Sequence, residues 1–358
     1  MGFLIAAAAL FFGFGSAYLL SHDVRYLTRA GFEEVAILQK AKPLDKLIAD
    51  PETPPDTRAW LSLVREARDY ANDIGFEAGK TYTKFTDVGR DTLLLVLSAS
   101  AKDCICPHTW RYPIVGRIPY KGFFDTQMAQ READRFAAQG MDVNLRPAAA
   151  FSTLGWFNDP LLSTALSRDS VDLAALVFHE IAHNTLYIKS ATPFNESFAQ
   201  MAGYRAAESF FRSRGDSALA QRAADRWADE IVLGEYYSEF VGRLEAFYDT
   251  KPGPAALDSG RAELAAWSRE QLQGPYGSRL KTWRIGPLAE RPINNAQLVG
   301  VRLYRTNLEW FETWFQRHDG DIAVAVRALR ELLDGAEGEQ AFQRLEAALA
   351  APAGQPDS

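Results

Sequence analysis

The distribution of apolar and polar residues sets the beginning of the chain apart from the rest. Gly2 to Leu20 form a run of 19 positions without a charged side chain. At about 1.5 Å of helical rise per residue, this run nearly spans a hydrocarbon core of about 30 Å. The small residues Gly15-Ser16-Ala17 also fit a signal cleavage site. Residues 1–22 are therefore predicted to be a signal peptide or an N-terminal membrane anchor, and both interpretations imply export to the cell envelope or periplasm.

Helical spacing of apolar residues governs most of the remaining chain. It predicts helices over Phe32–Ile48, with an interruption at Pro43, and over Thr57–Ile74. From Pro160 onward the pattern is almost wholly helical, and Gly274–Pro292 is the longest predicted loop. The helices predicted in this half are Val171–Ile188, Phe194–Arg212, Leu219–Phe247, Leu257–Gln271, Asn295–Arg317, Ile322–Asp334 and Glu339–Ala350.

A group of short strands separates these two helical regions. Apolar runs bounded by Gly and Pro predict strands over Thr92–Ala101, Arg111–Phe124 and Met141–Phe151. A helix over Gln127–Gln139 is predicted between the last two strands. Because strands gather in one stretch and helices in others, the pattern indicates an α+β fold that is predominantly α-helical.

Composition narrows the class of protein without deciding its chemistry. With 47% apolar and 24% charged residues, the chain has the balance of an ordinary globular protein. The 39 Lys and Arg residues are outnumbered by 46 Asp and Glu residues, which gives a net charge of −7. This charge argues against nucleic-acid binding, because a basic surface supplies most of the non-specific affinity. Nothing in the composition sets the oligomeric state.

Two of the five histidines lie in the segment His-Glu-Ile-Ala-His at positions 179–183. On a helix, His179 and His183 are one turn apart on the same face and can bind a single metal ion. Glu180 then lies beside the ion, where it can take a proton from water. The apolar run over residues 173–178 indicates a buried helix, whose polar residues need a function. The segment predicts a site for one Zn²⁺ ion with Glu180 as the catalytic base.

Catalytic zinc sites generally use three protein ligands and leave a further position for water. Glu196 follows His183 by thirteen positions, and Pro193 suits the start of a second helix. The connection is long enough to reverse the chain, so this second helix could bring the Glu196 carboxylate to the metal. Glu208 is the reserve candidate, and Asn195 is expected to support a ligand histidine by a hydrogen bond.

These motifs resemble those of the bacterial predicted zinc aminopeptidase family, whose members are usually exported lipoproteins. The matching positions run from about Tyr26 to Phe211, with a weaker match near Asn294, and they keep their order and rough spacing. The matching segments are 47–51, 112–124, 152–163, 179–183 and 194–199. The resemblance implies a gluzincin-like metallopeptidase that acts on peptides, most simply as an aminopeptidase.

The chain departs from that family at the end of the signal segment, where members usually carry a lipid-bearing cysteine. The first cysteine of this chain is Cys104. The uncleaved apolar segment is therefore expected to take the place of a lipid and to contact the membrane itself.

A zincin-like fold is expected, with a small mixed β-sheet packed on the metal-binding helix. Proposed ligands, substrate walls and oxyanion donors are spread along the chain, which favours one catalytic domain over residues 23–350. Its α/β part is expected at about residues 75–190 and its helical part at about residues 191–350. Residues 351–358 are expected to form a flexible tail.

The expected reaction is hydrolysis of a peptide bond by a water that zinc activates and Glu180 deprotonates. A further hydrogen-bond donor should stabilise the oxyanion. In gluzincins this donor is a Tyr or His from a later segment of the chain. Tyr236, Tyr237 and Tyr304 are the candidates.

Substrate is expected to bind along two segments that precede the metal-binding helix. An edge strand in this region could hold a peptide by main-chain hydrogen bonds. The candidates are Gly116, Tyr120 and Gly122 in the first segment and Gly155 and Trp156 in the second. Asn294 and Asn295 are further candidates, although a helix N-cap explains them equally well.

Two alternatives to a zinc aminopeptidase stay open. No recognisable acidic motif binds a substrate's α-amine, so a thermolysin-like endopeptidase is the nearest rival. A non-catalytic zinc-binding envelope scaffold is the other, although such a protein would not need Glu180. A weaker metal signal lies at Cys104, Cys106 and His108, where one residue between the cysteines is fewer than zinc sites usually have.

Overall fold

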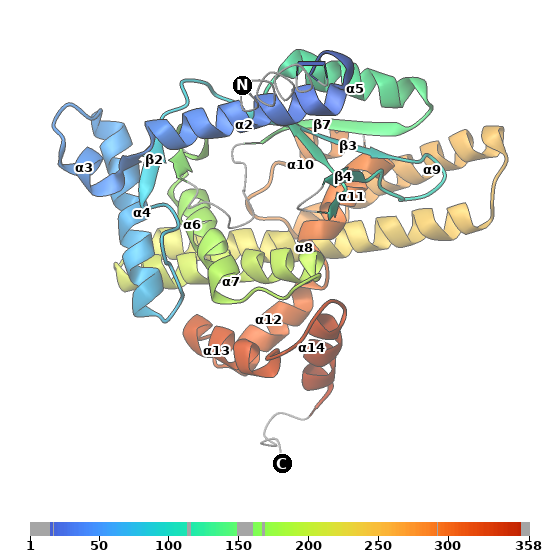
Figure 1. The fold of residues 1–358 in the computed structure, drawn as a ribbon. Helices are drawn as coiled ribbons and strands as arrows, with labels where there is room; N and C mark the ends of the chain where they lie inside the picture. The colour runs from blue at the N-terminus through green and yellow to red at the C-terminus, as the bar shows by residue number, and fades with distance from the viewer. Residues whose placement is uncertain are drawn as a thin grey trace.

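The computed structural model describes residues 15–16, 18–112, 116–148, 160–166, 169–291 and 293–351, and it is mostly helical, as predicted (Figure 1). The paired helices α6 (Ser170–Thr185) and α7 (Thr192–Ser213) pack against each other near its centre. The long α8 (Ser217–Asp249) packs on α7, and α4 (Pro55–Asp73) packs on α6. The helix that carries the two motif histidines is therefore covered by neighbouring helices.

The region before α4 contains two helices, which are separated at the predicted interruption. α2 (His22–Lys40) begins after Ser21, whose hydroxyl accepts a hydrogen bond from the main chain of Val24. The chain then forms the short strand β1 (Lys42–Pro43) before α3 (Leu44–Ala49) begins. The interruption predicted at Pro43 within Phe32–Ile48 is therefore observed, because proline has no N–H to continue a helix.

Residues 1–14 and 17 of the predicted N-terminal segment lie outside the described residues. Across the ranges that the structure describes, no helix combines the length and the apolar character needed to cross a membrane.

The first of the small sheets is mixed. β2 (Lys84–Thr86) pairs antiparallel with β1 and parallel with β8 (Leu161–Leu162), which leads through the 3₁₀ turn η1 (Ser163–Ala165) towards α6. Phe85 of β2 and Leu161 belong to the same hydrophobic core as the inner face of α6. The mixed sheet thus shares a core with the metal-binding helix.

The second sheet is antiparallel and has β3 (Leu94–Ser100) between β6 (Lys121–Phe123) and β7 (Asp142–Ala148). A separate ribbon pairs β4 (Trp110–Tyr112) with β5 (Gly116–Ile118). The single strand predicted over Arg111–Phe124 is therefore divided among several strands. The antiparallel sheet packs on α5 (Thr126–Ala138) through a second hydrophobic cluster that contains Leu97, Phe123, Met128, Phe136, Val143 and Leu145.

The C-terminal region is helical, but one predicted helix is interrupted. Its elements are α9 (Pro254–Gln273), η2 (Gly277–Arg279), α10 (Ile285–Glu290), α11 (Asn295–Tyr304), α12 (Leu308–Arg317), α13 (Ile322–Leu332) and α14 (Gln340–Ala350). The predicted helix Asn295–Arg317 breaks at Asn307, whose φ of 52° is left-handed. At the break, Thr306 N donates to Ser197 Oγ (3.1 Å). A tertiary contact thus replaces continued helix at this point.

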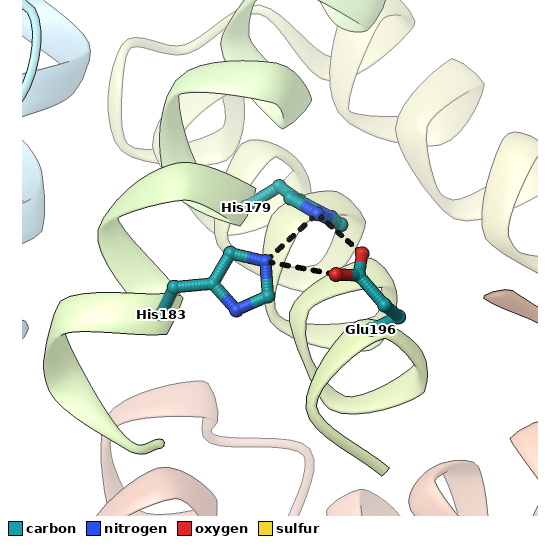
Figure 2. Close-up of side chains that lie close together, drawn as sticks. All are labelled: His179, His183 and Glu196. Carbon is teal, nitrogen blue, oxygen red and sulfur yellow. Dashed lines mark hydrogen bonds and ion pairs between the residues drawn. The ribbon is translucent and has the colours of Figure 1, made fainter. Parts of the chain in front are cut away.

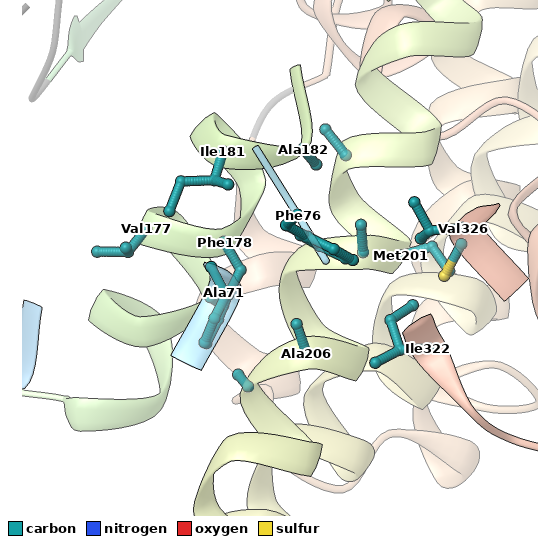
Figure 3. Packing of buried hydrophobic residues seen from close by; sticks show 14 of the residues in the cluster. Ala71, Phe76, Val177, Phe178, Ile181, Ala182, Met201, Ala206, Ile322 and Val326 are labelled. Carbon is teal, nitrogen blue, oxygen red and sulfur yellow. The ribbon is translucent and has the colours of Figure 1, made fainter. Parts of the chain in front are cut away.

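The main hydrophobic core packs against most of the surface of α6. Val177, Phe178, Ile181 and Ala182 are all fully buried. Figure 3 shows them packed among side chains that arrive from α7, from α13 and from the end of α4. Removing that much apolar surface from water holds the helix in one position. The partly polar face of α6 is then left to carry the site.

α6 and α7 approach each other closely because α7 presents small residues. A Cβ atom on Gly203 would lie 2.7 Å from the carbonyl oxygen of Ala175 and 3.3 Å from Cβ of His179. Ala199 and Ala206 extend the same row of small, fully buried residues one turn to either side. The backbones can therefore approach at the level of His179, where a side chain at position 203 would separate them.

Replacing Gly203 with alanine is expected to lower the free energy of unfolding by about 1–3 kcal/mol, because the added methyl group overlaps the main chain of α6. Urea unfolding followed by circular dichroism measures the change. Gly242 of α8 is the matched control, since a Cβ there meets nothing within 4 Å. Gly242→Ala should gain about 0.5–1 kcal/mol from helix propensity. Equal stabilisation by both variants would contradict the proposed close contact.

Candidate metal centre

Three potential metal ligands converge where α6 faces the N-terminal part of α7 (Figure 2). The Nε2 atoms of His179 and His183 are 3.2 Å apart. Glu196 places one carboxylate oxygen 3.5 Å from Nε2 of His179 and the other 3.8 Å from Nε2 of His183. The three side chains keep 13–22% of their surface accessible, so a ligand can reach them.

The chemistry and spacing of these atoms fit a divalent metal ion. Two imidazole nitrogens and one carboxylate oxygen lie within 4.8 Å of one another, which is a donor set that zinc accepts. Ligands about 2.0–2.1 Å from a tetrahedral ion would be about 3.3–3.4 Å from each other, close to the 3.2 Å between the two imidazoles. Two ring nitrogens that face each other at this distance also need a cation or a shared proton between them. The group could therefore hold a metal ion.

Local sequence positions the ligands on both helices. Asp169 caps α6 by accepting hydrogen bonds from Val171 N (2.9 Å) and Asp172 N (3.4 Å). Between the helices, the side chain of Asn195 bonds both main-chain groups of Ile188, accepting from its N and donating to its O. The expected support of a ligand histidine by Asn195 is therefore wrong in its partner. Asn195 instead fastens the reversing loop that brings Glu196 back to α6.

The charges of His179, His183 and Glu196 shift one another's pKa values. Burial, with some help from the neighbouring His179, lowers the pKa of His183 to about 4. Burial opposes the charged form of His179 as well, but the hydrogen bond to Glu196 and the charge of Glu180 raise its pKa. Burial would raise the pKa of Glu196, yet both histidines hold it below its ordinary value. His183 is thus neutral and Glu196 ionised at neutral pH, as metal ligands must be.

Tyr304 is the candidate donor that the fold brings to this group. Burial and the negative charges of Glu196, Tyr120 and Glu180 raise its pKa, against an opposing effect of Arg146. The hydroxyl therefore stays protonated and can donate a hydrogen bond. The break after α11 positions it, because Thr306 is bonded to Ser197, the residue next to Glu196.

The other two candidate tyrosines have different surroundings. Tyr236 is fully buried, and its hydroxyl pairs with Ser268 of α9; burial raises its pKa to about 12. The ring of Tyr237 lies 5.8 Å from the guanidinium carbon of Arg305. Neither pKa is influenced by the three ligands. The directions in which Tyr236 and Tyr237 point from α8 are set by the packing of that helix. The residue types alone do not reveal these directions.

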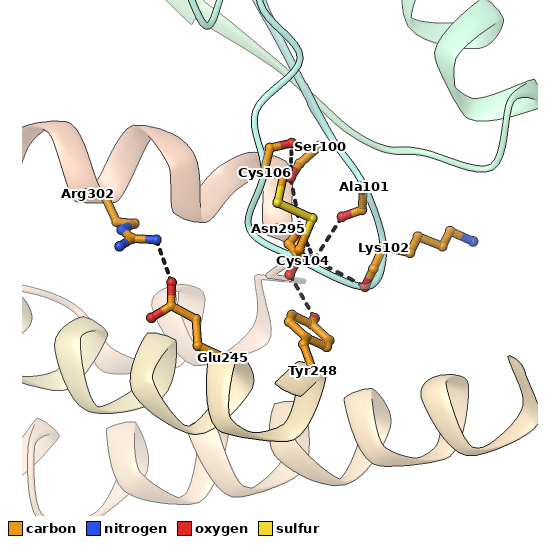
Figure 4. Close-up of a disulfide and its surroundings, with 9 residues drawn as sticks. All are labelled: Ser100, Ala101, Lys102, Cys104, Cys106, Glu245, Tyr248, Asn295 and Arg302. Carbon is orange, nitrogen blue, oxygen red and sulfur yellow. Dashed lines mark hydrogen bonds and ion pairs between the residues drawn. A yellow bond between two sulfur atoms is a disulfide. The ribbon is translucent and has the colours of Figure 1, made fainter. Parts of the chain in front are cut away.

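Asn294 and Asn295 have structural roles in this fold, and of the two predicted alternatives the helix N-cap is the one observed at Asn294. Asn294 caps α11 in a reciprocal capping box with Gln297. Asn295 is buried, and its amide donates to the carbonyls of Ala101, Lys102 and Cys104 while accepting from Tyr248 (Figure 4). These bonds tie the loop between β3 and β4 to α8 and α11.

The loop that Asn295 holds contains the two cysteines, which are joined as a disulfide. Cys104 and Cys106 therefore offer no thiolates to a metal. The ring of His108 packs instead on Trp110 and Phe136. The reserve ligand Glu208 is also engaged elsewhere, in ion pairs with Arg205 and Arg212.

Among the predicted substrate residues, Tyr120 has the clearest relation to the site. Its side chain is exposed, and the charges of Glu196 and Tyr187 add to desolvation in raising its pKa. Gly116 begins β5, and Gly122 pairs with Val96 in the antiparallel sheet. Gly155 and Trp156 lie outside the described residues.

Sequence reasoning missed three residues that shape the site. Gly203 has a recognisable signal, since glycine inside a helix often marks a close approach. Ser197 and Arg146 have none, because one acts through a bond to a distant loop and the other through its position on a sheet face. Such contacts arise only when remote segments come together.

The fold and site together define a mostly helical protein with a His-His-Glu group that could hold a metal ion. A family model described as "Putative aminopeptidase" matches residues 25–345. Because that match covers most of the chain, the protein belongs to this family. No curated protein and no solved structure matched the chain.

Zinc affinity of the metal-free protein is expected to rise as the pH is raised from about 6 to about 8. The raised pKa of His179 leaves its imidazole partly protonated at the lower end, and only the neutral imidazole binds metal. His183, with a pKa of about 4, is neutral throughout this window. Calorimetric titration with Zn²⁺ in buffers of different ionisation enthalpy would detect the proton release. Glu196→Gln should weaken binding and Glu208→Gln should not; an affinity independent of pH would contradict the expected linkage.

Proposed function

We propose that the protein is a zinc-dependent peptidase that removes residues from the amino end of peptides. The observation that carries this proposal is the convergence of His179, His183 and Glu196 beside Glu180 in a chain of the aminopeptidase family. Two imidazoles and one carboxylate are a typical protein contribution to a catalytic zinc site. A site that only stabilises the fold would not need a base next to such a group.

Each of the chain's own residues takes one task. Zinc, when bound, supplies a Lewis acid that polarises the scissile carbonyl and makes water more acidic. Glu180 accepts the proton of the attacking water and returns it to the leaving amine. The hydroxyl of Tyr304 donates a hydrogen bond to the carbonyl oxygen as negative charge develops there. The raised pKa of Tyr304 suits this task, since the hydroxyl keeps its proton.

We also propose that these residues form one catalytic unit. The ligands come from α6 and α7, the tyrosines from the loop before β6 and the end of α11. Segments far apart in the sequence thus contribute to the same reaction.

The apolar residues before α2 support export, and with it an envelope location.

Glu180→Gln is expected to lower kcat by about 100- to 10,000-fold while zinc content stays the same, because the variant loses the base but keeps the three ligands. Hydrolysis of matched peptides with free and blocked amino ends, together with metal analysis, measures both. Glu66→Gln, at an exposed position on α4, is the control and should behave as wild type. Cleavage of blocked peptides would instead identify an endopeptidase, and bound zinc without any turnover would identify a scaffold.

Tyr304→Phe is expected to reduce kcat by about 100- to 1,000-fold with little change in KM, since the lost hydrogen bond forms mainly in the transition state. Tyr236→Phe is the matched control, because that hydroxyl is bonded to Ser268 away from the ligands. Steady-state kinetics on an unblocked peptide separates the two constants. An unchanged kcat in Tyr304→Phe would remove this residue from the proposed mechanism.

A further inference from the structure

Arg146 lies on the face of the antiparallel sheet that looks away from α5. Side chains alternate along a strand, and Val143 and Leu145 of β7 pack into the cluster formed with α5. Arg146 therefore points to the opposite face. Its cross-strand partner, Val96, packs on that face with Leu162 of β8, which leads towards α6. The guanidinium is thus directed to the side of the sheet on which the metal group lies.

The same face of β7 runs beside α11. Asn295 N, at the start of α11, donates to the Asp142 carboxylate at the start of β7 (3.0 Å). α11 packs against β7, and Tyr304 is the last residue of that helix. The electrostatics agree with this placement, because the charge of Arg146 acts on the hydroxyls of both Tyr304 and Tyr120.

Glu196 acts on the same two hydroxyls with the opposite sign. Arg146 and the metal group are therefore both close enough to Tyr304 and Tyr120 to act on their hydroxyls. Arg261, which also reaches β7, is neutralised by Asp142. Arg146 is only partly exposed, and none of the carboxylates in the described ranges forms an ion pair with it. A partly desolvated guanidinium of this kind favours an anionic ligand, and a carboxylate matches its planar fork.

We propose that Arg146 binds the free C-terminal carboxylate of a short peptide whose scissile bond lies at the metal group. The proposal rests on the peptidase function above and specifies its substrates as di- or tripeptides with a free carboxyl end. A long chain has no carboxylate at that position, so Arg146 selects for length. Arg146 acts as a specificity residue and takes no part in proton transfer.

Binding of alanyl-leucine and of its C-terminal amide tests this proposal, with the Glu180→Gln protein used so that bound peptide is not cleaved. We expect the acid to bind about 10- to 100-fold more tightly than the amide. Adding Arg146→Met should remove that preference, and adding Arg146→Lys should restore part of it. Arg117→Met, on the exposed surface of β5, is the matched control and should keep the full preference.

Hydrolysis by the wild-type, zinc-loaded protein provides the second measurement. We expect kcat/KM for the acid to exceed that for the amide by a similar factor, and to fall as the peptide is lengthened. Equal binding of acid and amide by the Glu180→Gln protein would overturn the proposal, whatever the variants do. Preferential binding of the acid without hydrolysis by wild type would support the carboxylate site and contradict the peptidase function instead.

Discussion

The close contact between α6 and α7 is the constraint on which the rest of the site depends. Gly203 allows the α7 backbone to lie against Ala175 and His179, and the loop fastened by Asn195 reverses the chain over a short distance. Glu196, near the N-terminal end of α7, then faces both histidines. A wider separation of the helices would place the carboxylate beyond the reach of a shared ion, because metal–ligand distances vary little.

The same contact brings charged groups together in a partly buried region. The charges of Glu180 and Glu196 act on His179 and on Tyr304, and the charge of Glu196 also acts on Tyr120. This arrangement keeps imidazoles available as ligands and tyrosine hydroxyls protonated. In a largely buried site these interactions are stronger than on the surface, so small displacements of the helices have chemical consequences.

The features that were predicted correctly from the sequence all depend on residues that are close together in the chain. The His-Glu-x-x-His spacing places two side chains on one helical face whatever the surroundings, and α6 has nearly the predicted bounds. Short-range geometry also made Glu196 a reasonable third ligand, since a reversing loop of known length limits where α7 can begin. Most helix positions followed from apolar periodicity, apart from the break at Asn307, and the strand predicted over Arg111–Phe124 is divided.

Contacts between residues far apart in the sequence decided the other features of the site. Which of three tyrosines faces the ligands depends on the rotation of α8 and on the bond from Thr306 to Ser197, which joins residues 109 positions apart in the chain. Asn195 holds a loop, and Asn294 and Asn295, for which an N-cap was an equal alternative to substrate binding, hold a helix end and a loop, because an amide bonds whichever main-chain groups folding brings to it. The sequence by itself predicted the helix of the two histidines, the base beside them and the third candidate ligand through spacing along one chain. Only the tertiary structure decided what surrounds them, since burial, charge and direction at Tyr304 and Arg146 are set by segments that meet after folding.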